Sequence, residues 1–66
     1  INTINISKGD IVEARSPDGP MIIGQALTET YLGGPALVKI MLSTNNYISV
    51  DVNRWDVRVL YRNLLN

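Results

Sequence analysis

The chain has 66 residues, enough for one small domain, and 45% of them are hydrophobic. It contains neither cysteine nor histidine, which excludes disulfide bridges, thiolate or imidazole metal ligands, and catalysis by histidine. Six Lys and Arg residues balance six Asp and Glu residues, whereas a dedicated nucleic-acid-binding domain usually has a basic excess. We therefore expect a single domain over residues 1–66 that is not an enzyme, holds no metal or cofactor, and gains stability by assembling with further copies.

Nothing in the sequence predicts a membrane or secretory segment. No apolar run reaches the roughly 18 residues that a membrane-spanning helix needs. No basic stretch followed by an apolar stretch opens the chain. We therefore expect a cytoplasmic protein with no membrane partner.

Five β-rich segments follow one another, at residues 10–15, 21–30, 36–43, 47–52 and 57–61. The first alternates Val12 and Ala14 with charged residues, as a strand with one buried face does. The sequence Pro-Asp-Gly at residues 17–19 predicts a tight turn, because proline presets one backbone dihedral angle and glycine accepts positive φ. In the second segment the lone Gly24 indicates a bend, a bulge or a close approach of two strands.

The last three segments also alternate apolar and polar side chains. Val38, Ile40 and Leu42 share one face of the third. One apolar face of the last two segments contains Ile48, Val50, Val52, Val57 and Val59. Five short strands joined by tight turns predict an all-β fold, namely a small five-stranded, strongly bent antiparallel sheet or open barrel.

The last two strands are expected to have a second role. At least one edge of a five-stranded open barrel exposes unpaired backbone groups, which small proteins protect with charges, prolines or bulges, or pair with another subunit. Residues 48–52 contain only Asp51 as charged protection. We therefore predict that the apolar residues of these two strands lie at a subunit interface, in the core of one chain, or in both. Repeated head-to-tail pairing would close a ring or extend a filament.

This strand plan resembles the Sm-like (LSm) family, whose bent five-stranded sheets pair their fourth and fifth strands between subunits. The first Sm motif resembles residues 11–42, with a turn at Asp18-Gly19 and a long strand carrying Gly24 at its bend. The second motif, with its valine-rich last strand, resembles residues 50–60. The resemblance implies an SH3-type barrel of a divergent member, of phage or bacterial type.

The resemblance also implies candidate RNA contacts. Tyr31, in the loop where Sm-like proteins stack bases, can stack a base or cap the barrel as a surface tyrosine. Trp55 can stack a base, since every base has an aromatic face, or pack across a subunit contact or over the barrel mouth. Asn53 and Arg54 can contact a base and a phosphate at a ring pore, or simply build the turn.

Three functions follow as alternatives. The resemblance implies a ring of about five to seven identical subunits that binds single-stranded RNA or acts as an RNA chaperone. The chain departs from the family, because residues 30–34 lack its base-holding Asp and Asn, and Asn53-Arg54 replaces its Arg-Gly pair. These departures and the zero net charge favour a structural or interaction protein with an SH3-like barrel, such as a phage assembly component, that does not bind RNA. A monomeric adaptor that binds extended peptides on Tyr31, Tyr47 and Trp55 is the third alternative.

Overall fold

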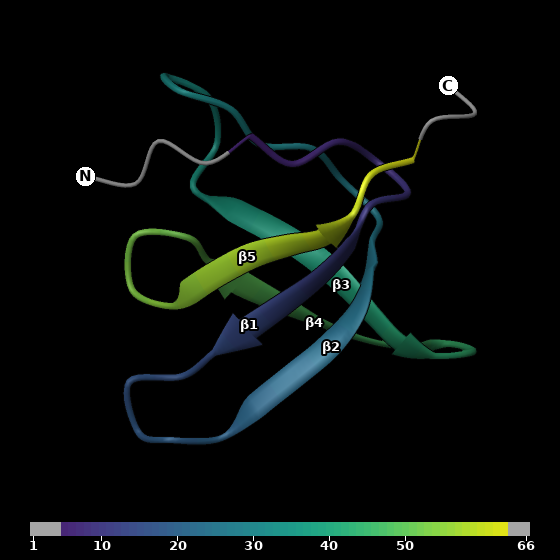
Figure 1. Cartoon of the computed structure of the whole chain (residues 1–66), viewed down its shortest axis with the longest axis vertical. Helices are drawn as coiled ribbons and strands as arrows, with labels where there is room; N and C mark the ends of the chain where they lie inside the picture. The colour runs from purple at the N-terminus through teal and green to yellow at the C-terminus, as the bar shows by residue number, and fades with distance from the viewer. Residues whose placement is uncertain (1–4, 64–66) are drawn as a thin grey trace.

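The structure is a computed structural model that describes residues 5–63, and these form five antiparallel strands in one sheet (Figure 1). The strands are β1 (Ile11–Arg15), β2 (Met21–Ala26), β3 (Leu37–Ser43), β4 (Asn46–Asp51) and β5 (Asp56–Tyr61). Their order across the sheet is β4-β3-β2-β1-β5, so β4 and β5 are its two edges. The prediction of an all-β domain of five antiparallel strands is confirmed. The sheet is open, because β4 and β5 do not pair with each other among the described residues.

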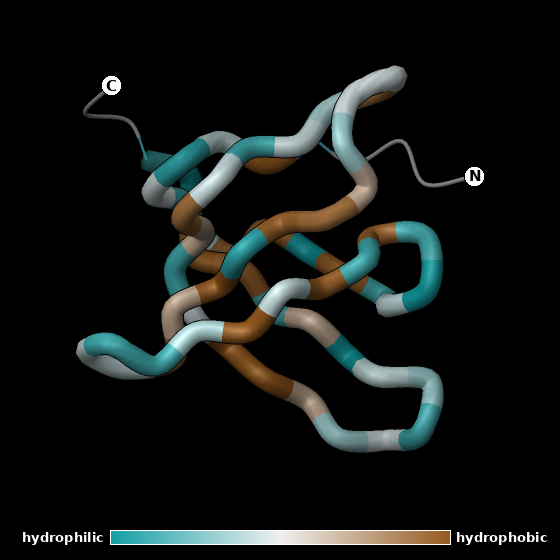
Figure 2. The backbone as a smooth tube through the Cα atoms, turned by 180° about the vertical axis from the view of Figure 1, so that it is seen from behind, coloured by the Kyte–Doolittle hydropathy of each residue, from teal (hydrophilic) through white to brown (hydrophobic). Residues whose placement is uncertain are grey.

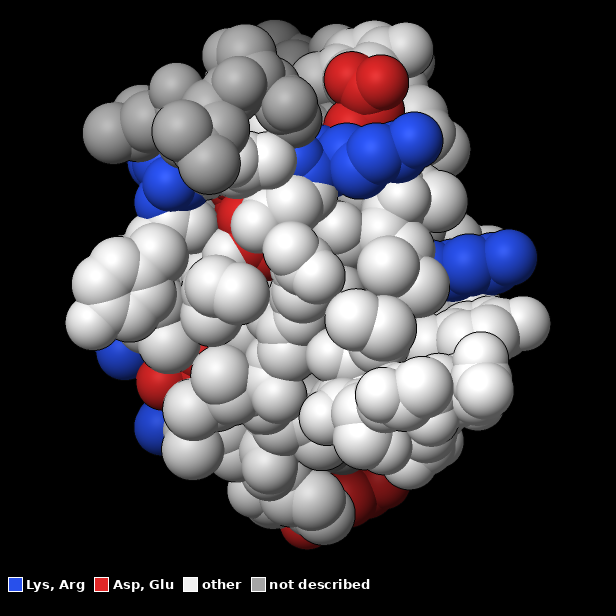
Figure 3. All heavy atoms as spheres, turned by 90° about the vertical axis from the view of Figure 1, so that its right-hand side faces the viewer, with Lys and Arg blue, Asp and Glu red and all other residues white. Residues whose placement is uncertain are grey.

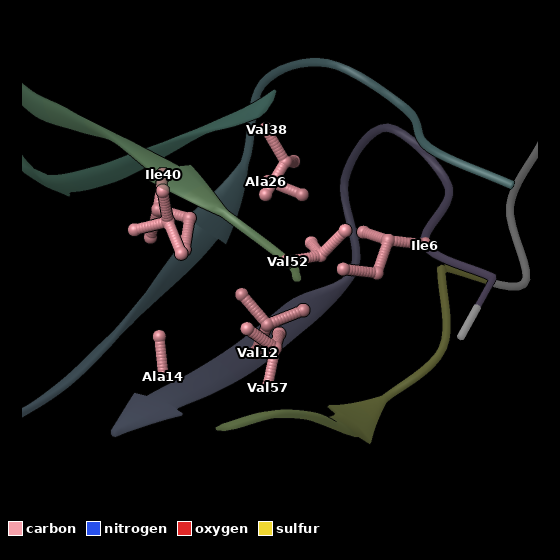
Figure 4. Close-up of a cluster of buried hydrophobic side chains, with 9 residues drawn as sticks. Ile6, Val12, Ala14, Ala26, Val38, Ile40, Val52 and Val57 are labelled. Atoms are coloured by element: carbon pink, nitrogen blue, oxygen red, sulfur yellow. The ribbon is translucent and has the colours of Figure 1, made fainter. Parts of the chain in front are cut away.

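One face of this sheet forms the hydrophobic core. In Figure 1, β3 and β4 pass behind β1, β2 and β5, and Figure 4 shows core side chains from β1 and β5 facing those of β3. In Figure 2 the hydrophobic stretches follow the strands, and the connecting turns are mostly hydrophilic. The buried apolar residues are Ile6, Val12, Ala14, Ala26, Val38, Ile40, Val50, Val52 and Val57. The period-two alternation therefore predicted the buried face of β1, β4 and β5. In β3 it was right for Val38 and Ile40 but wrong for Leu42, which is 39% exposed beside the register shift between Met41 and Ser43.

The segment before β1 closes one end of the core. Ile6, which is only 2% exposed, joins the core cluster. Its backbone N–H donates to the carbonyl of Thr30 at 2.9 Å, and the N–H of Thr30 donates back at 3.0 Å. This isolated bridge ties the N-terminal segment to the loop that follows β2.

The second strand is shorter than predicted, ending at Ala26 rather than at residue 30. The hydroxyl of Thr28 accepts the backbone N–H of Lys39 at 3.1 Å, so a side chain takes the place of a backbone carbonyl and ladder pairing ends there. The β2–β3 ladder contains only Gln25↔Met41 and Ala26↔Ile40. The first four residues of β2 therefore pair with β1 alone.

Gly24 is required by the close approach of β2 to β3. A Cβ atom there would collide with the backbone oxygen of Met41 and would lie 2.6 Å from Cγ2 of Ile40. Among the alternatives that the lone glycine raised, close packing of two strands is the one observed.

Candidate functional site

The loop of residues 27–36 presents two large apolar side chains to solvent. The N–H of Gly34 donates to the carbonyl of Tyr31 at 2.8 Å, and Gly33 has φ of 82°, the positive value that a type II turn requires at its third residue. Leu32 is therefore the second residue of a tight turn and is 67% exposed. The ring of Tyr31 packs against Gly34, where any Cβ atom would collide with it. Tyr31 is thus exposed but held in place at the tip of the loop.

The turn between β4 and β5 is built on Asp51. The backbone N–H groups of Arg54 and Trp55 donate to its carbonyl at 3.0 and 2.9 Å, and the N–H of Asn53 donates to its Oδ1 at 2.9 Å. Asn53 and Arg54 are exposed. Arg54 has no ion-pair partner within residues 5–63. This turn therefore presents to solvent one amide and one arginine without an ion pair, beside the exposed carboxylate of Asp56.

Loop 27–36 and the β4–β5 turn are connected at their bases. The N–H of Val52 donates to the carbonyl of Ala36 at 2.9 Å, so the end of the loop lies beside the start of the turn (Figure 1). No hydrogen bond or ion pair in the described part of the chain joins Tyr31 to Asn53 or Arg54. In one subunit these three candidate residues are therefore separate exposed groups and do not form one pocket.

Trp55 occupies a different environment from the other three candidates. Its side chain is partly buried and packs against the hydrophobic core cluster. This placement corresponds to the packing role that the sequence left open, and it leaves less of the indole available for stacking with a base.

The side chains of the candidate interface residues lie in the core of a single chain. Val50, Val52 and Val57 are buried, and Ile48 and Val59 pack against the same cluster. The structure therefore places the side chains of these five residues in the core, which is one of the roles predicted for them. The large side chains that β4 and β5 expose instead are Tyr47, Leu60 and Tyr61.

The free edge of β4 carries unpaired backbone groups. The N–H of Val52 donates to the carbonyl of Ala36, and since bonded and non-bonded pairs alternate along an antiparallel ladder, the Lys39↔Ser49 pair is not bonded. Consistently, the carbonyl of Lys39 accepts a hydrogen bond from the β2 side at 2.7 Å. The N–H and C=O groups of Ser49, and by the same alternation of Tyr47, therefore point away from β3 to the open edge.

Sequence reasoning missed a buried carboxylate that joins the segment before β1 to the segment after β5. Asp10 is fully buried, and its Oδ2 accepts the N–H of Ser7 at 2.9 Å and Nη1 of Arg62 at 3.3 Å. Its Oδ1 accepts the N–H of Asn63 at 2.8 Å. Burial alone would raise the pKa of Asp10, but these hydrogen bonds and the charge of Arg62 outweigh it, so the pKa is lowered.

Asp10 therefore holds the turn at residues 7–10 against the segment that follows β5. The sequence showed it only as the first residue of the β-rich segment 10–15. A negative charge at the start of a strand and a positive charge more than fifty positions later give no local signal of their pairing.

Two classes of site are not found in residues 5–63. These residues contain no cluster of three or more acidic side chains that could hold a metal ion. They also contain no helix long and apolar enough to cross a membrane.

Comparison with models of protein families, with curated proteins and with solved structures found no match to this chain.

Proposed function

We propose that this protein is a non-catalytic assembly module that associates head to tail with further copies of itself through the edges of its sheet. The observation that carries the proposal is the strand order, which leaves β4 and β5 as the two edges of one sheet. A β4 edge of one copy and a β5 edge of the next would satisfy backbone groups that each copy leaves unpaired. Because the two edges differ, the contact is heterologous and repeats into a ring or a filament.

The same proposal includes a bent, Sm-like or SH3-like arrangement of the sheet. Val12, Val38, Ile40 and Val50 are completely buried, although no helix covers the sheet within the described residues. Side chains on one face of a sheet reach zero exposure only when other parts of the chain cover them, here other strands and the segment around Ile6. The sheet is open and not strongly curled, so this burial supports a moderate bend over its apolar face.

Substitution of Ser49 by proline tests the assembly. The N–H of this residue points to the open edge, so proline removes a donor that only a neighbouring copy would use and adds a ring that obstructs pairing. We expect the wild type to have a concentration-independent mass of several subunits by size-exclusion chromatography with light scattering. Ser49→Pro is expected to elute as a folded monomer, and the control Ser49→Ala, which keeps the N–H, is expected to assemble. A monomeric wild type would refute the proposal.

RNA binding is a second candidate function, favoured by the exposure of three of the predicted residues. Arg54 carries a charge with no ion-pair partner in residues 5–63, Asn53 is exposed beside it, and Tyr31 presents an aromatic ring. In a ring of copies the Arg54 side chains would repeat around one axis and supply a positive charge that a single neutral chain lacks.

Titration with single-stranded oligouridine and oligoadenine separates these two functions. If the assembly binds RNA through Arg54, then Arg54→Ala lowers the affinity. It also reduces the salt slope of log K by about 0.7 for each phosphate that the arginine no longer neutralises. Arg15→Ala, which removes an equally exposed arginine on β1, is the matched control and keeps the wild-type affinity. An assembled protein that binds neither oligonucleotide would be a structural module.

A further inference from the structure

The first half of β2 forms a third open edge, inside the sheet. The β2–β3 ladder ends at Gln25↔Met41, and Figure 1 shows β3 diverging from β2 beyond this point. Residues Met21 to Ile23 are paired with β1 on one side and lie beyond the end of the ladder on the other. This edge is distinct from the outer edges on β4 and β5.

The backbone of this edge is directed toward the gap. The N–H of Ser16 donates to the carbonyl of Pro20 at 2.8 Å, and alternation along the β1–β2 ladder then makes the pairs that contain Met21 and Ile23 non-bonded. Their N–H and C=O groups therefore point away from β1, where β3 provides no paired residue. The outward N–H and C=O groups recur every second residue. An extended peptide presents its own donors and acceptors with the same two-residue period, so it can pair with them.

The side chains around this edge are apolar. Met21 and Ile23 are 46% and 49% exposed, and Leu42, just past the last β2–β3 pair, is 39% exposed. Ile22 and Ile48 are partly buried against the core. Figure 3 views the molecule from the right-hand side of Figure 1, where uncharged residues cover most of the face and charged residues lie mainly around its margin. The exposed side chains of Met21, Ile23 and Leu42 therefore favour an occupant with apolar residues facing them.

One positive charge lies beside the edge. Nη2 of Arg15 is 3.9 Å from the sulfur of Met21, so the guanidinium reaches from β1 across to β2. The neighbouring Glu13 is already paired with Arg58 at 3.2 Å, and Arg15 has no ion pair within residues 5–63. A carboxylate on the outward side of an added strand, opposite Met21, would be within reach of this guanidinium.

From these observations we propose that the β2 edge at Met21–Ile23 binds an extended segment of a partner protein by strand addition. The segment is apolar on alternate residues and carries one acidic side chain that pairs with Arg15. Backbone hydrogen bonds to Met21 and Ile23 supply affinity, while the apolar surface and Arg15 determine which sequences bind. The proposal does not depend on assembly through β4 and β5, because it uses a different edge.

The probe is a capped, fluorescently labelled peptide with valine at every second position and threonine between, except for one central glutamate. Its affinity is measured by fluorescence anisotropy. Ile23→Pro removes the N–H that faces the gap. This N–H makes no hydrogen bond to β1, so the β1–β2 pairing is kept, and peptide binding is expected to weaken at least tenfold. Arg15→Glu is expected to weaken binding about tenfold and to favour the matching peptide with lysine in place of glutamate. Lys39→Glu makes the same charge change at an exposed position of β3 and is the control.

Each result decides the proposal. Loss of affinity in Ile23→Pro and Arg15→Glu, with the reversed preference for the lysine peptide, supports strand addition at β2. The absence of binding by the wild type at millimolar peptide, or equal binding by the wild type and both variants, overturns it. Binding that Ser49→Pro abolishes and Ile23→Pro leaves intact places the peptide on β4 and also overturns it. Circular dichroism of each variant verifies the fold, and Arg15→Glu alters only a surface side chain.

Discussion

Replacing Asp10 by alanine is expected to destabilise the fold far more than replacing its charged partner, Arg62. The carboxylate is 1% exposed, whereas the side chain of Arg62 is 53% exposed. Removal of the carboxylate takes away the acceptor of two partly buried hydrogen bonds, those from the backbone N–H groups of Ser7 and Asn63. Removal of the guanidinium takes away one half-exposed donor only.

The two costs differ by several kcal/mol. A hydrogen bond to a charged group contributes about 1.5–3 kcal/mol to stability. Asp10→Ala removes the acceptor of two such bonds, so it is expected to lower the free energy of unfolding by about 3–6 kcal/mol. A solvent-screened pair such as that with Arg62 contributes under about 1 kcal/mol, which is the expected cost of Arg62→Met. Asp10→Asn retains one oxygen and is expected to fall between them. A chain of this length has a total stability of roughly 3–10 kcal/mol, so Asp10→Ala removes much of it.

Urea unfolding followed by tryptophan fluorescence measures these differences, because Trp55 packs on the core. The expected order of destabilisation is Asp10→Ala, then Asp10→Asn, then Arg62→Met. If Arg62→Met cost as much as Asp10→Ala, the ion pair and not the backbone hydrogen bonds would dominate. If Asp10→Asn unfolded at the wild-type urea concentration, the carboxylate would contribute nothing and the reasoning would be refuted.

Three further predictions concern the same fold. Folding lowers the pKa of Asp10. The ionised carboxylate therefore stabilises the fold fully above its unfolded pKa of about 3.9, and this stabilisation is lost as pH falls through the folded pKa. The urea midpoint of the wild type should then fall toward that of Asp10→Asn in acid, and a constant difference would contradict this. Gly24→Ala should cost about 1–3 kcal/mol or more, since the collision is with a backbone oxygen; an unchanged midpoint would mean that β2 and β3 can separate at no cost. Ile6→Ala should cost about 2–5 kcal/mol and the exposed control Leu32→Ala under about 0.5 kcal/mol, and equal costs would show that Ile6 is not part of the core.

The fold was accessible from the sequence wherever side chains alternate with period two. Val12 and Ala14 in β1, and Val50 in β4, lie on the face that the alternation predicted, and all three are fully buried. Turn chemistry also predicted the β1–β2 connection at residues 17–19 and the special position of Gly24. Local patterns of this kind are read directly from neighbouring residues.

Features that depend on distant parts of the chain were not accessible. Ile6 lies before the first predicted strand, and its burial depends on pairing with Thr30, 24 positions later. Arg62 gives no local signal of its role, because it reaches Asp10 from 52 positions away. The partial burial of Trp55 likewise follows from the packing of the whole sheet. The exposed positions of Tyr31, Asn53 and Arg54 were predicted from the loops that contain them.

The hydrogen bond from Asn63 to Asp10 also has a consequence for synthesis on the ribosome. The two residues are 53 positions apart, and the strand pair β1–β5 joins Glu13 to Arg58 across 45 positions. The β3–β4 hairpin is local and can form early, whereas long loops close late. Until residues 56–63 have left the exit tunnel, β1 lacks one neighbour and Asp10 lacks two of its donors. The nascent chain can therefore complete this sheet only after that segment has emerged.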